Sequence, residues 1–281
     1  MQTGSMWGNV LFLPTSINRK KLASAVQGKT ILITGASSGI GEQLAYLMAT
    51  CDVHLILVAR REEKLLTIQR EIEKLGARVS IFSADLRVAE EMEYFLAFLQ
   101  QQQGGVDIVV SNAGLSIRHA IQDSLDRYHD FTRTMAINYF APVRLLLSVI
   151  PQLTRNNGQI INVSTINTSL IPLPHWAAYQ ASKSAFDTWL RSAAPELNAL
   201  GITTTSIYLP LVRTPMILPT TTYRNMPAMS AEHAARIIAK SMYTKRRTYM
   251  PWWLIFGQVA STLGRGLWER FAPGMLRKRG K

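Results

Sequence analysis

Tyr179 and Lys183 suggest chemistry by their types and spacing, since they end the stretch Tyr-Gln-Ala-Ser-Lys. In an α-helix, side chains four positions apart lie on one face, one turn from each other. A phenol has an ordinary pKa of about 10 and exchanges protons poorly at neutral pH unless its phenolate is stabilised. A lysine one turn away would lower that pKa electrostatically. The pair therefore predicts an acid–base catalyst, although a motif this short also recurs by chance.

A glycine-rich loop stands near the start of the chain, between a β-branched run and a helix that begins near Glu42. Residues 34–41 have the sequence Thr-Gly-Ala-Ser-Ser-Gly-Ile-Gly. Glycines permit a tight turn and a close approach of the backbone to a pyrophosphate, whose charge then faces a helix N-terminus. The alternative is a strand-to-helix turn without a ligand. We expect a dinucleotide site that includes Gly35, Ser37, Ser38, Gly39, Ile40 and Gly41.

The end of the next apolar strand indicates which dinucleotide is bound. An acid at this place binds the ribose 2′-hydroxyl of NAD, whereas a nearby arginine accommodates the 2′-phosphate of NADP. Here the strand is followed by Arg60 and Arg61, with no acid before Glu62. Two guanidinium groups suit a dianionic phosphate better than a hydroxyl. The alternative is a solvated arginine pair, and NADP(H) is the predicted cofactor.

The elements that must position these residues alternate between strands and helices. The strands are short, continuous apolar runs, as expected when helices cover both faces of a sheet. We therefore predict an α/β fold, a single Rossmann-like domain with a doubly wound parallel sheet. Basic extensions over residues 1–27 and 246–281 flank this domain, which covers residues 28–245. Strands are expected at residues 30–34, 53–59, 79–83, 106–111, 159–163 and 203–209, and helices at 62–75, 89–103, 126–150 and 179–200.

Composition and charge exclude several classes of protein. The chain has 281 residues, of which 47% are hydrophobic and 17% charged, and its formal net charge is +13. With Cys51 as its one cysteine and no Cys/His cluster at metal-ligand spacing, it has neither a disulfide scaffold nor a predicted metal site. No uncharged apolar run is long enough for a clear transmembrane helix. The basic residues gather at the two ends, which argues against a nucleic-acid face across the body.

With these motifs in this order, the chain resembles the short-chain dehydrogenase/reductase family from about residue 28 to residue 245. The resemblance implies that Asn138 is a catalytic asparagine and that Asp85 contacts the adenine of the cofactor. It also implies that Tyr179 and Lys183 bind the cofactor as well as acting in catalysis. The remaining cofactor contacts that it implies are Leu86, Asn112, Ala113, Gly114, Val212 and Thr214.

The chain departs from the family pattern at two points. The fifth strand of the family usually ends in two serines, the second of them catalytic, whereas here the two positions are Ser164 and Thr165. Thr165 stands one residue further from the tyrosine than is usual. We favour Thr165 as the catalytic hydroxyl and keep Ser164 beside it, since one of the two is expected only to bond local backbone. The family's Pro-Gly after strand six is Pro210-Leu211, which changes the expected path of that loop.

The chemistry implied by the family is hydride transfer from a nicotinamide to a carbonyl carbon. Tyr179 would donate a proton to the carbonyl oxygen, which Thr165 or Ser164 would hold. Lys183 would lower the pKa of the phenol and, with Asn138, connect it through water to solvent. Stabilisation of the developing alkoxide is the main effect expected of these groups.

Within the family, residues 114–120, 126–131, 141–144 and 206–216 resemble the bacterial fatty acyl-CoA reductases. This implies a lipophilic carbonyl substrate, either a fatty acyl-CoA or a long-chain aldehyde. Arg118 or His119 would meet a coenzyme A phosphate, or else be solvated loop residues. The alternatives are a ketone or secondary-alcohol oxidoreductase of 3-oxoacyl or hydroxysteroid type, and a non-catalytic NADP-binding regulatory protein. An apolar lid for an acyl chain is expected from Met216, Ile217, Leu218, Met226 and Met229.

The C-terminal tail combines tryptophan with basic residues. From Lys245 to Lys281 it has nine Lys/Arg residues against one acid, Glu269, and three of the six tryptophans. This combination suits an amphipathic helix at a membrane surface, although the glycines in the tail lower its helix propensity. The alternative is a tail packed on its own domain or on a second subunit. We expect a cytoplasmic homo-oligomer, a dimer or tetramer, with this tail as its contact to a membrane surface.

Overall fold

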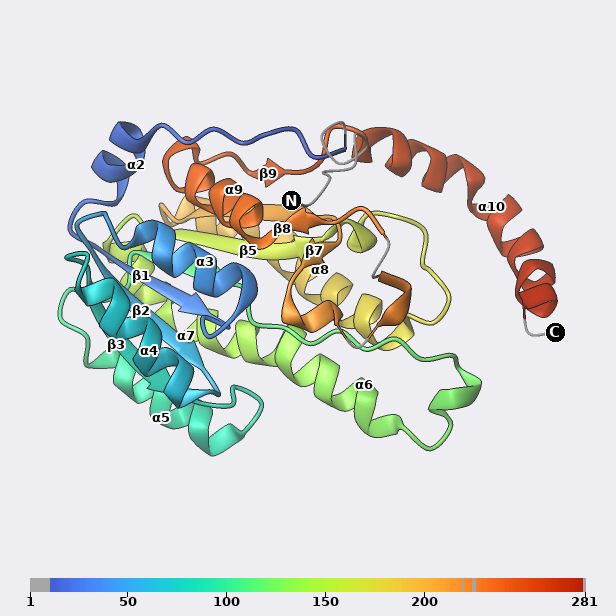
Figure 1. The fold of residues 1–281 in the computed structure, drawn as a ribbon, viewed down its shortest axis with the longest axis horizontal. Helices are drawn as coiled ribbons and strands as arrows, with labels where there is room; N and C mark the ends of the chain where they lie inside the picture. The colour runs from blue at the N-terminus through green and yellow to red at the C-terminus, as the bar shows by residue number, and fades with distance from the viewer. Residues whose placement is uncertain (1–10, 219, 224–225, 280–281) are drawn as a thin grey trace, which may run out of the picture.

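A computed structural model of the chain describes residues 11–218, 220–223 and 226–279. Its centre is a seven-stranded sheet in the order β3-β2-β1-β4-β5-β6-β9, with every neighbouring pair parallel (Figure 1). The predicted doubly wound parallel sheet is thereby confirmed. Its strands are β1 (Lys29–Thr34), β2 (Val53–Ala59), β3 (Arg78–Ser83), β4 (Ile108–Ser111), β5 (Gln159–Thr165), β6 (Thr203–Leu209) and β9 (Thr248–Tyr249).

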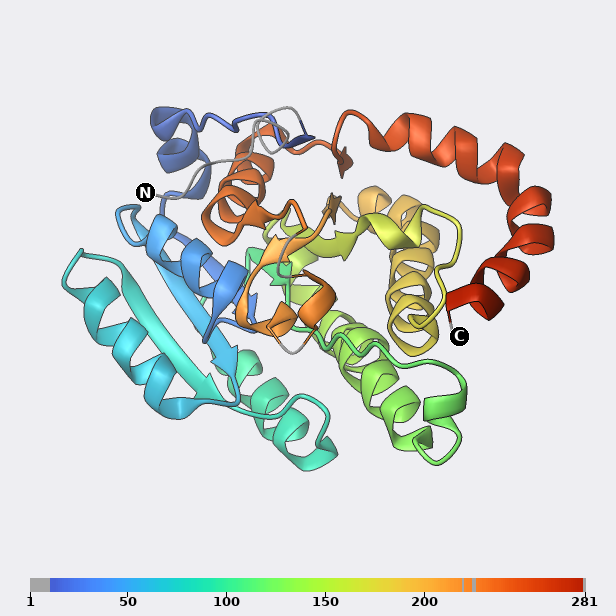
Figure 2. The same ribbon diagram turned by 45° about the vertical axis from the view of Figure 1, so that its right-hand side comes forward.

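Helices cover both faces of the sheet because successive side chains of a strand point to opposite sides. On β1, Ile31 and Ile33 belong to one buried cluster, and Leu32 belongs to the other. Figure 2 shows the sheet between the two helical layers. One layer contains α2 (Arg19–Val26), α3 (Gly39–Met48), α4 (Glu62–Glu73) and α9 (Ala231–Thr244), and the other contains α5 (Ala89–Gln100), α7 (Ala141–Arg155) and α8 (Ala177–Ala199).

Helix α2, within the expected N-terminal extension, packs on the body of the fold. The side chain of Asn18 caps it by accepting a hydrogen bond from the backbone N of Lys21 at 3.0 Å. Leu22 and Val26 are buried in the cluster that α9 also covers. Residues 19–26 therefore contribute to the core, and the division of the chain at residues 27 and 245 stays a prediction.

A single helical run joins α6 (Tyr128–Met135) to α7 through a π-helical turn at Ala136–Phe140. π-Helical turns are rare and often occur at functional sites. By length and mean hydropathy, this run over residues 128–155 is the one helix in the described part of the chain that could cross a membrane. Leu145, Leu146 and Val149 are, however, buried against the sheet. This helical run is therefore a core helix of the fold.

Strand β5 extends two residues beyond the predicted end and so includes both candidate hydroxyl residues, Ser164 and Thr165. Neighbouring strand residues face opposite sides of a sheet. Three short strands are absent from the prediction: β9 at the sheet edge, and β7 (Val212–Arg213) with β8 (Met229–Ser230), which pair with each other.

The C-terminal tail forms one long helix, α10 (Leu254–Arg279), in spite of its glycines. It starts beside the segment that follows β5 and then extends away from the body (Figures 1 and 2). The Oγ of Ser261 accepts a hydrogen bond from the backbone N of Ile171 at 3.1 Å. Just before the helix, Nε1 of Trp253 donates to the carbonyl oxygen of Leu11 at 3.1 Å. The start of α10 is thus tied to the body.

Candidate active site

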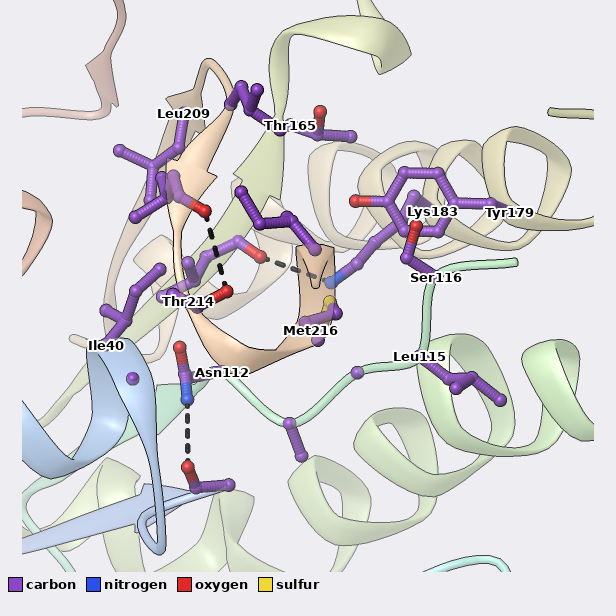
Figure 3. A pocket seen from close by; sticks show the side chains of 18 of the residues that line it. Ile40, Asn112, Leu115, Ser116, Thr165, Tyr179, Lys183, Leu209, Thr214 and Met216 are labelled. Carbon is purple, nitrogen blue, oxygen red and sulfur yellow. Dashed lines mark hydrogen bonds between the residues drawn. The ribbon is translucent and has the colours of Figure 1, made fainter. Parts of the chain in front are cut away.

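A cavity of about 890 Å³ lies at the carboxyl ends of the strands, where open α/β sheets bind their ligands. It brings together nearly all the residues predicted from the sequence, and Figure 3 shows part of its lining. Among the predicted catalytic and cofactor residues, Gly41 and Asn138 are the two that do not line it; both lie behind its wall. The structure thus gathers the dinucleotide residues and the tyrosine–lysine pair into one space.

The glycine loop between β1 and α3 has no room for a side chain at its glycine positions. Gly35 and Gly39 have positive φ values of +68° and +59°, a region that favours glycine. A Cβ on Gly39 would lie 2.9 Å from Cγ2 of Thr214, and one on Gly41 would lie 2.5 Å from the carbonyl oxygen of Gly35. Ser38, at the N-cap of α3, makes no capping hydrogen bond. The backbone amides of the first turn of α3 therefore suit an anion at this end of the cavity.

The predicted arginine pair lies beside this loop and lines the cavity. Nη2 of Arg61 donates to the hydroxyl and to the carbonyl oxygen of Ser37, both at 3.0 Å. Nη1 of Arg60 lies 3.8 Å from Oδ2 of Asp85. Asp85 is itself held by Arg87, which lies 2.6 Å away and keeps the pKa of the carboxyl below its usual range. If Asp85 contacts the adenine, its carboxylate would therefore do so while it also pairs with Arg87.

The Asn112-Ala113-Gly114 segment after β4 is hydrogen-bonded to the residue at the start of the glycine loop. Nδ2 of Asn112 donates to the carbonyl oxygen of Thr34 at 2.9 Å. The backbone amides of Asn112 and Ala113 both donate to Oγ1 of Thr34, each at 2.9 Å. On the other side, Oγ1 of Thr214 donates to the carbonyl oxygen of Val212 at 3.5 Å. These contacts fix the walls between which a dinucleotide would lie.

Tyr179 and Lys183 project from α8 into the cavity, near Thr165 (Figure 3). Nζ of Lys183 donates to the carbonyl oxygen of Val163 at 3.3 Å. Burial raises the pKa of Tyr179 to about 12, and a hydrogen bond with Thr165 offsets part of this rise. Burial also lowers the pKa of Lys183 to about 8. Both shifts arise because removal from water disfavours the charged form of each group, and the lowering of the tyrosine pKa by Lys183 stays a prediction.

The two candidate hydroxyls have different surroundings. Thr165 bonds the phenol of Tyr179, and its Oγ1 also accepts a hydrogen bond from the backbone N of Asn167 at 3.4 Å. Ser164 is 5% exposed, and its Oγ is buried with no hydrogen-bond partner among the described residues. The geometry therefore favours Thr165 as the hydroxyl next to the tyrosine.

Asn138, in the π-helical turn, positions the segment after β4. Its Nδ2 donates to the carbonyl oxygen of Leu115 and to Oγ of Ser182, both at 2.9 Å. Its Oδ1 accepts from the backbone N of Leu115, also at 2.9 Å. A Cβ on Gly114 would lie 3.0 Å from this Oδ1 and 3.4 Å from Nζ of Lys183. Both amide donors of Asn138 are therefore committed to holding the chain beside the lysine.

Two aromatic residues that no motif indicated lie beside the tyrosine. The ring of Trp176 meets the ring of Tyr179 edge-on, with centroids 5.8 Å apart. It also stacks on Tyr223, with centroids 5.7 Å apart. The position of Trp176, three residues before the tyrosine, could have suggested this contact. Tyr223 comes from the region between β7 and β8, and only the tertiary fold brings it here.

Of the residues predicted for a lid and for a phosphate contact, some line the cavity and others do not. Arg118 lines the cavity, while Nδ1 of His119 is held by Oδ2 of Asp130 at 3.0 Å. Only Arg118 is thus placed to meet a ligand in the cavity. Of the expected lid, Met216, Ile217 and Met226 line the cavity, Leu218 is exposed outside it, and Met229 is buried in the core.

Comparison with known proteins agrees with this geometry. The family model for short chain dehydrogenase matches residues 29–241. A fatty acyl-CoA reductase of Acinetobacter baylyi is 42% identical over 241 residues, which cover 85% of this chain and 78% of that protein. A fatty acyl-CoA reductase of Mycobacterium tuberculosis is 37% identical over 231 residues, covering 82% and 79%. L-sorbose reductase from Gluconobacter frateurii, solved with NADPH and L-sorbose, has a TM-score of 0.72 at 25% identity, covering 80% of this chain and 95% of that structure. The chain therefore belongs to the short-chain dehydrogenase family of oxidoreductases.

Proposed function

We propose that the protein is an NADPH-dependent reductase of lipophilic carbonyl compounds, most specifically of fatty acyl-CoA or long-chain aldehydes. The observation that carries this proposal is one cavity that joins the glycine loop and arginine pair to Tyr179, Lys183 and Thr165. Another part of its wall is apolar and includes Leu170, Leu173, Met216, Ile217 and Met226. The identity to the fatty acyl-CoA reductase of Acinetobacter baylyi supports the substrate class.

The residues at the glycine loop fit NADPH. The amides at the start of α3 suit the pyrophosphate, and Arg60, Arg61 and the Ser37 hydroxyl suit a 2′-phosphate. The NADPH held by the related sorbose reductase supports this cofactor. When bound, NADPH would supply the hydride that adds to the carbonyl carbon, and the cofactor would then leave as NADP⁺.

The side chains of α8 and β5 would complete the reaction. Tyr179, neutral because of its raised pKa, donates a proton to the carbonyl oxygen, which Thr165 holds by a hydrogen bond. The charge of Lys183 then favours the phenolate that remains until solvent returns the proton. With a thioester, the product of this step is a hemithioacetal, whose C–S bond breaks to give aldehyde and the free thiol of coenzyme A. With an aldehyde, the product is the alcohol.

Removal of the arginine that contacts Ser37 is expected to weaken the preference for NADPH. In Arg61→Ala, the KM for NADPH should rise by about tenfold, since a charged hydrogen bond to phosphate is lost. The KM for NADH should change little, because NADH has no 2′-phosphate. Steady-state kinetics with both cofactors measures this difference. An equal rise for both cofactors would show that Arg61 holds the loop and not the phosphate.

A pair of substitutions separates the two hydroxyls. Thr165→Val keeps the side-chain shape and is expected to lower kcat by about tenfold or more, because one hydrogen bond to the developing alkoxide is lost. Ser164→Ala removes a hydroxyl that bonds no described residue and should leave kcat within about twofold. The reverse order of effects would assign the catalytic role to Ser164.

The rate of reduction is expected to fall as the pH rises through about 8, where the buried Lys183 loses its charge. The phenol of Tyr179, with its pKa raised to about 12, stays protonated through this range and does not limit the rate. The measurement is kcat between about pH 6 and pH 10 at saturating NADPH and substrate. A kcat that stays constant above pH 8 would show that the reaction does not need the charge of Lys183.

The function itself is tested with purified protein, NADPH and palmitoyl-CoA, following NADPH absorbance together with free thiol. Thiol that appears in step with NADPH loss supports thioester reduction. NADPH that is bound but not consumed would contradict it and favour an aldehyde or a ketone, to be identified in a carbonyl panel. A failure to bind NADPH would overturn the cofactor. A cytoplasmic location and a homo-oligomeric state belong to the same proposal, and sedimentation of the purified protein tests the latter.

A further inference from the structure

Helix α10 has an apolar face that points away from the body of the protein. Leu263 is 80% exposed, and Phe256, Val259, Leu267 and Phe271 are each more than half exposed. These five residues, spaced by three or four positions, form one stripe on a helix with about 3.6 residues per turn. We call them the outer face of α10. Contiguous exposed apolar surface of this kind marks an interaction site.

In its first turns, the opposite side of α10 contacts the protein. Leu254 is fully buried and Ala272 nearly so, and Ser261 bonds the backbone of Ile171. The outer face of α10 is therefore not part of the hydrophobic core. It is the solvent side of a helix that contacts the body at its start.

The charge of the tail that contains α10 favours an anionic partner. The tail from residue 245 to residue 281 has nine basic residues and one acid, and that acid, Glu269, pairs with Arg265 at 2.9 Å. A second copy of the chain would bring two such basic tails together at a cost in electrostatic repulsion. A bilayer with anionic headgroups would instead attract the basic side chains and bury the apolar ones.

The start of α10 also forms part of the cavity wall. Trp253 lines the cavity, and so do Leu170 and Leu173 from the segment after β5. A Cβ on Gly257 would lie only 3.1 Å from Cδ2 of Leu170, so this segment and the helix are in close contact. The apolar end of the cavity and the first turns of α10 therefore belong to one surface.

We propose that the outer face of α10 docks on an anionic lipid bilayer and places the apolar end of the cavity at the membrane surface. The substrate then enters along Trp253, Leu170 and Leu173 directly from the lipid phase. This inference rests on the proposed function for the nature of the substrate. The docking itself depends only on α10 and is separately measurable.

Docking is tested by flotation with phosphatidylcholine vesicles that contain or lack phosphatidylglycerol. The full-length protein is expected to float with the anionic vesicles and much less with the neutral ones. Leu263→Gln/Leu267→Gln should reduce binding by more than about tenfold, because two large apolar side chains no longer enter the lipid. The matched control is Leu125→Gln, an 83% exposed leucine outside the tail. Protein that stays unbound with anionic vesicles overturns the docking, as does a double variant that binds as well as the parent.

Sedimentation velocity distinguishes the bilayer from a second copy of the chain. The double variant should keep the oligomeric state of the parent protein. Conversion of an oligomer to monomers by the double variant, without vesicle binding by the parent, would assign the outer face to a subunit contact and overturn the proposal.

Delivery from the membrane is tested with two aldehydes, NADPH and anionic vesicles. Against hexadecanal in the vesicles, the double variant should lose most of its activity relative to the parent. Against water-soluble hexanal, the two proteins should be equally active. Equal activity on both aldehydes would overturn the entry route. Inactivity of the parent on both would instead contradict the proposed function and leave the flotation result standing.

Discussion

Replacing Tyr179 with phenylalanine is expected to lower kcat by about 10²–10⁴-fold while leaving the affinity for NADPH unchanged. The substitution removes only the hydroxyl that donates the proton. It keeps the ring that packs edge-on against Trp176, so the shape of the cavity is preserved. Without the donor, the developing alkoxide would have to take its proton from water. Fluorescence titration with NADPH and steady-state kinetics measure the two expectations separately.

The control for this experiment is Tyr94→Phe, which removes the hydroxyl of a tyrosine that is 62% exposed on α5. Its kcat and its NADPH affinity should both equal those of the parent protein. A Tyr179→Phe protein that keeps full turnover would remove Tyr179 from the role of proton donor. A loss of NADPH binding in the same variant would instead show that the hydroxyl holds the cofactor.

The second large effect is expected from Gly41→Ala, in the first turn of α3. The added Cβ would lie 2.5 Å from the carbonyl oxygen of Gly35 and 2.9 Å from Nδ2 of Asn112. Both neighbours belong to the framework of the loop, so the loop must shift. Overpacking of this kind costs about 1–3 kcal/mol, and we expect NADPH affinity to fall by about 10- to 100-fold and Tm to fall with it.

A matched glycine tests whether the effect is local. The position of Gly266 in α10 has no atom within 4 Å of an added Cβ. In Gly266→Ala, NADPH affinity should stay unchanged, and Tm should stay the same or rise because alanine favours a helix by about 1 kcal/mol. Equal NADPH affinity in Gly41→Ala and in the parent would show that the loop tolerates a side chain and would weaken its assignment as the pyrophosphate site.

Features that depend on local pattern could be predicted from the sequence. Strand β2 has the bounds that its apolar run indicated, and the parallel order follows from alternating strands and helices. The glycine loop and the Tyr179–Lys183 pair were also recognisable, because each lies within a few neighbouring residues whose spacing has a physical reason. What the sequence left open was how the ends of distant elements meet.

Tertiary structure decided those points. Strand β5 extends to Thr165, and Ser164 and Thr165 both line the cavity, but only Thr165 bonds the phenol of Tyr179. Burial, which no local pattern reveals, raised the pKa of Tyr179 to about 12. Tyr223 reached Trp176 only through the fold of the chain. The sequence by itself determined the sheet, the loop and the catalytic pair, since these are local; exposure to water and contact between distant segments are properties of packing, and the tertiary structure alone determined them.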